Sequence, residues 1–357
     1  MTPLQRRFIR RLLVGALAVL AVLAAADTGL WFFATTRLAH HLAAWQARSH
    51  TAGWTLSAGP PQRAGWPLAA AIVLPYPVLA GGATDLPGGL FWQAAQAELS
   101  LALLPPWRLT LRVTGPQRFR LATLAEFGFA ADRFEVDVPL APFQRNPGAQ
   151  AHEAEFSAAG LRAALPTGEL AIAAMALHAV TRPADASGEA ALTLTGSARA
   201  IDLPPLPGGR PWPPGPYIAS AAFDTAITGP VPRGSSLAAR AASWRDGGGT
   251  LVVRHLALAW GPLGLTGSAT MALDKRLQPT ATAMASLAGY EAPLEALATS
   301  GLLAPRVVQA VKGVLGILAR PPQDGSPPQV ELPVTLQDRT LAAGPFPLLR
   351  LQEWVWR

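Results

Sequence analysis

The chain has 357 residues, of which half are apolar and 14% are charged, and it contains no cysteine. So high an apolar content excludes a largely disordered chain, and without cysteine the fold has no disulfide to stabilise it. The net charge of +7 does not indicate nucleic-acid binding, because four positive charges are arginines before residue 12 and no dense basic cluster follows.

The first predicted element is an apolar helix over residues 12–36, in which Asp27 is the only charge. A helix of about 20 apolar residues spans a bilayer, and basic residues beside it remain on the cytoplasmic side. Those that precede this helix are Arg6, Arg7, Arg10 and Arg11. We therefore expect 1–11 to be a cytoplasmic tail, 12–36 a transmembrane anchor and 37–50 a juxtamembrane helix, with the bulk of the chain in the periplasm.

The same segment also fits a cleaved signal peptide, with Ala24-Ala25-Ala26 as a cleavage site before Asp27. Against cleavage, apolar and aromatic residues resume at 30–33, where an aromatic belt at the outer interface is expected. The apolar residues contribute about −5 kcal/mol to the free energy of membrane insertion, and Asp27 contributes about +3 kcal/mol. These values favour an uncleaved anchor in the inner membrane and leave the signal peptide as the alternative.

Alternation of apolar and polar residues predicts β-strands in the rest of the chain. It is strictest at 107–114, 133–138, 263–274 and 330–337. Less regular strands are expected at 54–58, 68–74, 96–103, 170–180, 190–202, 217–228, 250–260 and 280–288. Half-buried strands separated by Gly and Pro are typical of antiparallel sheets, so we predict a mainly β protein. A Pro-rich linker at 204–216 is expected to separate a first β-rich half, 51–203, from a second, 217–357.

We expect the apolar strand faces to line an open, curved sheet rather than a closed core. The candidate residues of this apolar groove are Leu109, Leu111, Val113, Leu263, Leu265, Met271, Leu273, Leu332, Val334 and Leu336. Short helices are predicted at 235–244, 292–300 and 304–319, and the last is expected to lie against one end of the sheet.

Motifs of common enzymes are missing from the sequence: there is no GxSxG elbow, HExxH helix, phosphate-binding loop or dinucleotide fingerprint. His178 and His255 lie on separate predicted strands, and the carboxylates are scattered. We therefore assign no catalytic, cofactor-binding or metal-binding residue and expect no cofactor and no enzymatic activity.

Several short segments resemble a known family. They are Gly53-Trp54, Gly65-Trp66-Pro67, Trp260-Gly261-Pro262-Leu263, Leu265-Thr266-Gly267, Val334-Thr335-Leu336-Gln337-Asp338 and Gly344-Pro345-Phe346-Pro347-Leu348. In these segments the chain resembles DUF2125, a family of alphaproteobacterial envelope proteins. Its closing pattern is similar to the C-terminal strands of AsmA-like proteins, which are anchored in the inner membrane and carry long sheets with an apolar concave side. The resemblance implies an AsmA-like curved sheet, although Asp338-Arg339 replaces the Asp-Gly expected at one turn.

Three functions are consistent with these sequence features. The first is a non-enzymatic, membrane-anchored periplasmic protein that binds lipid or supports the organisation of the cell envelope. The second is a protein-interaction module of an envelope complex, in which the apolar patch binds another protein. The third is a periplasmic hydrolase, which requires a cluster of His, Ser and acidic residues in one pocket.

Overall fold

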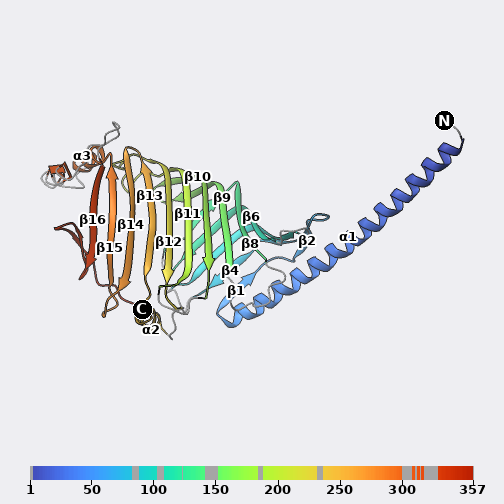
Figure 1. Cartoon of the computed structure of the whole chain (residues 1–357), viewed down its shortest axis with the longest axis horizontal. Coiled ribbons are helices and arrows are strands. Elements are labelled where there is room, and N and C mark those ends of the chain that lie inside the picture. The colour runs from blue at the N-terminus through green and yellow to red at the C-terminus, as the bar shows by residue number, and fades with distance from the viewer. Residues whose placement is uncertain are drawn as a thin grey trace. The chain divides into compact units, whose positions relative to one another are not determined.

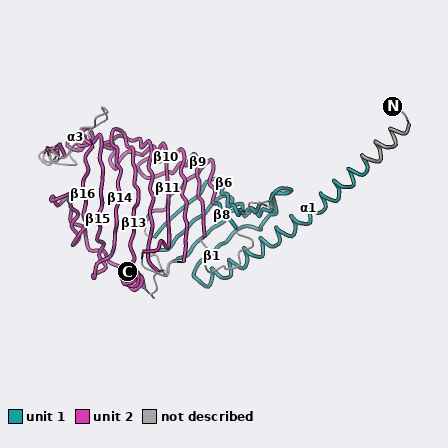
Figure 2. Tube along the Cα trace, viewed as in Figure 1, with its two compact units in different colours: residues 1–124, 137–142 teal, residues 125–136, 143–357 magenta. Residues whose placement is uncertain are grey.

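The structure is a computed structural model of the chain. It describes residues 3–356 except for 83–87, 103–107, 123, 141–151, 184–187, 231–235, 300–307, 310–311, 314 and 317–328, and it describes the backbone alone at 3–13, 346 and 348. The chain divides into two compact units (Figure 2). Unit 1 comprises residues 1–124 and 137–142, and unit 2 comprises residues 125–136 and 143–357.

Unit 1 begins with a single 49-residue helix, α1 (Pro3–Thr51), which combines the expected anchor and juxtamembrane helix (Figure 1). Between residues 14 and 30 every side chain except Asp27 is exposed, so this half of α1 packs against no part of its own unit. From Trp31 onward one stripe is covered, and Thr35 and Leu38 are buried. The helix is long and apolar enough to cross a membrane.

The sheet of unit 1 is organised around one long strand, β5 (Leu90–Ala102). One edge of β5 pairs with β6 (Arg108–Leu121), and its other edge pairs in succession with β4 (Val78–Gly81) and β3 (Ala69–Pro75). The remaining strands are β1 (Trp54–Ser57), which pairs with β4, and β2 (Gln62–Ala64), which pairs with β3. Strand β8 (Arg133–Pro139) contributes residues to both units.

The core of unit 1 lies between this sheet and the second half of α1. Leu38 of the helix packs against Ile72 and Leu74 of β3, and Leu99 and Leu109 of β5 and β6 surround them. Burial of these aliphatic side chains fixes the second half of α1 to the sheet.

Unit 2 is an antiparallel meander in which strands that follow one another in the sequence are also neighbours in the sheet. Its strands are β7 (Phe127–Ala130), β9 (His152–Leu165), β10 (Gly168–Thr181), β11 (Ala190–Asp202), β12 (Tyr217–Thr228), β13 (Leu251–Trp260), β14 (Leu263–Leu273), β15 (Pro279–Ala288), β16 (Gln329–Gln337), β17 (Thr340–Ala343) and β18 (Phe346–Arg350). Strand β7 pairs with β9 at the start of the meander. Two helices are inserted: α2 (Leu237–Asp246) between β12 and β13, and α3 (Glu291–Thr299) between β15 and β16.

The predicted fold class, a mainly β protein with an apolar N-terminal helix, a large antiparallel sheet and a few helices, is confirmed. The helices predicted at 235–244 and 292–300 correspond to α2 and α3. The Pro-rich segment 204–216 forms the connection between β11 and β12, which pair directly within unit 2. Most of 304–319 and Trp107 lie outside the described residues.

Candidate functional site

The pairing register of β13 to β16 shows which of their side chains share a face of the sheet in unit 2. Leu258, Leu265, Leu287 and Val330 form one cross-strand row, and Leu251, Met271, Ala281 and Leu336 form a parallel one. Side chains alternate along a strand, so both rows belong to the same face. We call this surface the apolar face; in these four strands it consists of Leu251, Val253, Leu256, Leu258, Trp260, Leu263, Leu265, Gly267, Ala269, Met271, Leu273, Ala281, Ala283, Ala285, Leu287, Val330, Leu332, Val334 and Leu336.

The middle of the apolar face is a strip of small side chains bounded by larger ones. On β14 and β15 the strip consists of Gly267, Ala269, Ala281, Ala283 and Ala285. Leu256 of β13 opposes Gly267 on one side, and Leu332 of β16 opposes Ala285 on the other. The distance across the sheet between β13 and β16 is three strand spacings, about 14 Å. The strip is therefore wide enough for an extended hydrocarbon chain.

Among the residues that the structure describes, no second layer covers this part of the sheet. Strands β10, β13, β14 and β15 contain no buried residue at all, and the apolar-face side chains of β14 are all of intermediate exposure. Leu256 is 40% exposed. A sheet that packs against a core normally buries one face completely, whereas this one leaves its aliphatic face accessible.

The apolar face continues onto earlier strands of the meander. Leu194 of β11 pairs with Thr225 of β12, which in turn pairs with Val253 of β13. At the start of the meander, aromatic rings meet: Phe134 lies edge-on to Phe156 with centroids 5.0 Å apart. Phe156 lies on a strand that was not predicted, because β9 (HEAEFSAAGLRAAL) is rich in good helix formers and shows little alternation.

One end of the apolar face is closed by a small cluster. Tyr290, which precedes α3, Leu315 and Val330 of β16 are buried together, and Leu263, Leu287, Leu294 and Leu332 pack around them. Burial raises the pKa of the Tyr290 phenol above 10.0, and the adjacent Glu291 carboxylate adds to the rise. Leu315 lies in the segment 304–319, so the prediction that this segment lies against one end of the sheet is confirmed at Leu315.

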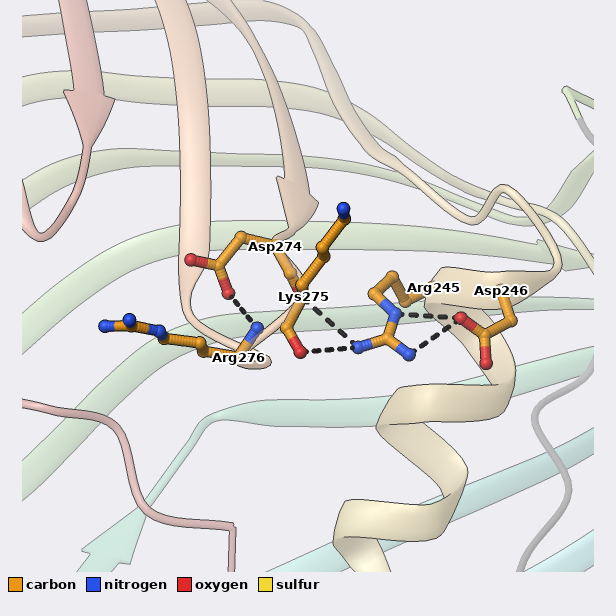
Figure 3. A network of polar contacts seen from close by, with 5 residues as sticks. All are labelled: Arg245, Asp246, Asp274, Lys275 and Arg276. Atoms are coloured by element: carbon orange, nitrogen blue, oxygen red, sulfur yellow. Dashed lines mark hydrogen bonds and ion pairs between the residues drawn. The ribbon is translucent and has the colours of Figure 1, made fainter.

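The other end of β14 and β15 is held by a polar network around their turn (Figure 3). Arg245, in the last turn of α2, donates to the carbonyl oxygens of Asp274 and Lys275 at 3.4 and 3.0 Å and forms an ion pair with Asp246 at 2.8 Å. The Asp274 carboxylate accepts from the backbone N–H of Arg276 at 2.7 Å. These contacts fix α2 beside the turn and away from the middle of the apolar face.

The opposite face is polar and carries a row of residues that includes three titratable side chains. His178 of β10, Thr195 of β11, Asp224 of β12 and His255 of β13 are register partners in succession. A β-bulge at Val253/Leu256 brings Arg254 next to this row, where it donates to Asp224 at 3.0 Å. Among the described residues, no three His, Cys, Asp or Glu side chains are placed to hold a metal ion.

A shallow hollow of about 370 Å³ lies over β13 to β15 beside this row. Ser268, Thr270, Thr282 and Met284 of the polar face contribute to its lining. Val253, Ala269 and Ala283 of the apolar face also contribute to its lining.

The predicted groove residues fall into two separate groups. Leu263, Leu265, Met271, Leu273, Leu332, Val334 and Leu336 all belong to the apolar face of unit 2. Leu109, Leu111 and Val113 lie on β6 of unit 1, where Leu109 packs against the cluster beneath α1 and Val113 is only 2% exposed. Those three belong to the packed side of unit 1, so we restrict the candidate site to unit 2.

No curated protein and no solved structure matches this chain. A family described as "Uncharacterized protein conserved in bacteria (DUF2125)" matches residues 31–352, which include the second half of α1, the rest of unit 1 and nearly all of unit 2. The match begins at Trp31, where α1 first contacts its own unit. The chain therefore belongs to the DUF2125 family.

Proposed function

We propose that this protein is a non-enzymatic, membrane-anchored periplasmic protein whose apolar face in unit 2 holds the acyl chains of lipid. The observation that supports it most strongly is the uncovered aliphatic surface of β13 to β15. Soluble monomers rarely expose large contiguous apolar patches, because each Å² left in water forgoes about 25 cal/mol. Acyl chains would cover this surface without needing specific polar partners.

The N-terminal helix supports lipid as the occupant. Residues 14–30 of α1 are apolar and, apart from Asp27, exposed all round, as expected of a membrane span. The arginines at 6, 7, 10 and 11 favour a cytoplasmic N-terminus under the positive-inside rule, and in this orientation the residues that follow the span lie in the periplasm. An ectodomain tethered to a bilayer has a constant supply of lipid beside it. The AsmA-like resemblance of the closing strands agrees with this role.

The test places a bulky polar side chain on either face of the same strand. Met271→Arg lies on the apolar face, and Thr270→Arg, its neighbour on the polar face, is the matched control. Both full-length variants are reconstituted in nanodiscs that contain a phospholipid with a photoactivatable acyl chain, and crosslinking to unit 2 is quantified together with thermal stability. We expect Met271→Arg to lose most of its crosslinking while remaining folded, and Thr270→Arg to retain both properties.

Two outcomes would contradict the proposal. Unfolding of Met271→Arg alone would show that the face is a core covered in solution. Equal crosslinking in both variants and the wild type would show that acyl chains do not occupy this face. Crosslinking of the face to a single protein in native membranes, without lipid, would favour the interaction-module function instead.

A further inference from the structure

A hairpin of unit 1 runs along α1 at the point where the exposed apolar half of the helix ends. The indole N–H of Trp31 donates to the carbonyl oxygen of Ala64, the last residue of β2, at 3.0 Å. The Arg63 guanidinium lies over the Phe32 ring, 4.4 Å from its centroid, and donates to Thr36 at 3.4 Å. Figure 1 shows β2 beside the helix. The hairpin is therefore attached to α1 at residues 31–36.

The direction of the hairpin follows from these contacts. Arg63 lies near residues 32 and 36, and Ala64 lies near Trp31. Strand β2 therefore runs toward the N-terminal end of α1. On the returning strand, Ile72 packs against Leu38. The extended chain between Ile72 and Leu68 is about 13 Å long, which equals the rise of about nine residues along a helix. The tip of the hairpin thus lies near the level of residue 29.

That level coincides with the outer end of the apolar span. Residues 12–30 are 19 residues long, and at 1.5 Å per residue they cover about 28 Å, close to the thickness of a bilayer's hydrocarbon core. The hairpin tip therefore lies where the hydrocarbon meets the headgroups, if Arg11 marks the inner boundary.

The residues at the tip suit this environment and are unusual in water. Trp66 is 56% exposed and Leu68 is 75% exposed, although both are large and apolar. Gly65 makes the turn possible: its φ is +86°, and a Cβ there would lie 2.5 Å from the carbonyl oxygen of Ala69. The turn is closed by a hydrogen bond from the Ala69 N–H to the Gly65 carbonyl at 2.9 Å. Tryptophan in particular is enriched at membrane interfaces.

Cationic side chains stand just beyond the tip. Arg63 stacks on Phe32, and Arg37 lies over the Phe33 ring, 5.2 Å from its centroid. Arginine above an aromatic belt is at the height of lipid phosphates, with which guanidinium groups form strong hydrogen bonds.

We propose that the β2–β3 turn, Gly65 to Leu68, is a second membrane contact, which inserts Trp66 and Leu68 into the periplasmic leaflet beside α1. This inference rests on the membrane span of the proposed function but not on lipid binding by unit 2. Together, α1 and the turn hold unit 1 to the bilayer at two points, which restricts its rotation about the helix. A protein partner would also cover the tip, but the adjoining apolar span favours lipid.

The absence of cysteine makes a direct test possible. Single-cysteine variants of the full chain, Leu68→Cys, Leu20→Cys and Tyr76→Cys, are labelled with an environment-sensitive fluorophore and reconstituted in vesicles of phosphatidylethanolamine and phosphatidylglycerol. Leu20 is 65% exposed within the apolar span, and Tyr76 is 72% exposed beyond the far end of β3. Quenching by spin-labelled lipid is then measured for each label.

We expect the label at 68 to be blue-shifted and quenched almost as strongly as that at 20, while the label at 76 remains in water and unquenched. Quenching at 20 with none at 68 would overturn the membrane contact and leave the span intact. A blue-shifted label at 68 that lipid does not quench would assign the tip to a protein partner and would equally overturn the proposal. No quenching at 20 would contradict the span itself.

Discussion

The side-chain amide of Gln278 donates to the carbonyl oxygen of Trp354 at 3.1 Å and accepts from the backbone N–H of the same residue at 2.9 Å. Gln278 follows the β14–β15 turn and is only 6% exposed. The Trp356 indole adds a third hydrogen bond, at 2.8 Å, to the Leu277 carbonyl. The C-terminal residues are thus fastened to the turn that Arg245 holds from α2.

Replacement of this amide should release the C-terminal tail. Gln278→Ala removes the two hydrogen bonds to Trp354 and a third to the Arg276 carbonyl oxygen at 3.3 Å, all at a buried position, and we expect a loss of about 2 kcal/mol in the free energy of unfolding. Gln337→Ala, at an exposed position of β16, is the control and should change stability by less than about 0.5 kcal/mol. Urea denaturation followed by tryptophan fluorescence measures both, and equal effects would show that the tail is not held by Gln278.

The packed side of unit 1 can be tested at adjacent residues of β6. Val113→Asp places a carboxylate where the wild-type side chain is 2% exposed, so it should cost at least about 3 kcal/mol. Arg112→Asp points to the exposed side and should cost less than about 1 kcal/mol. Denaturation midpoints compare the two variants. Similar losses would mean that the register of β6 is wrong.

The cluster at the end of the apolar face should make stability depend on alkaline pH. The folded-state pKa of Tyr290 is raised above 10.0, so the unfolded chain releases this proton first as the pH increases. Its contribution to stability is fully present below pH 10 and is lost as the pH rises toward the folded-state pKa. Unfolding midpoints at about pH 9 and pH 11 should therefore fall more steeply for wild type than for Tyr290→Phe. If the unfolding midpoints of the wild type and of Tyr290→Phe fall equally, the pH dependence arises from other titratable groups.

The hypothesis that α1 is an uncleaved transmembrane anchor makes a separate prediction about processing and topology. The mature protein should retain residues 1–26, and a reporter fused after Arg357 should be active only in the periplasm. Replacement of all four N-terminal arginines by Glu should impair this orientation, because basic residues hold the tail in the cytoplasm. Intact mass and reporter activity are the measurements. A mature N-terminus at Asp27 would establish a signal peptide instead.

The sequence predicted the strictly alternating strands and eight less regular ones, and it missed the long strand β9. Strand β12 appears at its predicted bounds, 217–228, since its Gly- and Pro-rich flanks mark both ends. Strand β9 was missed because its stability comes from pairing with β10 along its whole length, which no local pattern reveals. At Asp338 and Arg339 the turn expected to need Asp-Gly still forms, with positive φ at both residues.

The candidate site was only partly predictable for a different reason. Alternation shows that one side of a strand is apolar, but it does not show what covers that side. Val113 and Met271 occupy equivalent positions in similar patterns. One is buried in unit 1 and the other lies on the uncovered face of β14, because α1 packs on the first sheet and no element packs on the middle of the second among the described residues.

The central claim, that lipid occupies the apolar face, is tested most directly by mapping where an acyl chain touches the wild-type protein. The full chain is reconstituted with a phospholipid that carries a photoactivatable group near the end of its acyl chain, and crosslinked residues are identified by mass spectrometry. The account predicts crosslinks in α1 and also, in alternation along the strands of unit 2, at Leu265, Met271 and Leu332 but not at Thr266 or Thr270. Crosslinks confined to α1 would contradict it.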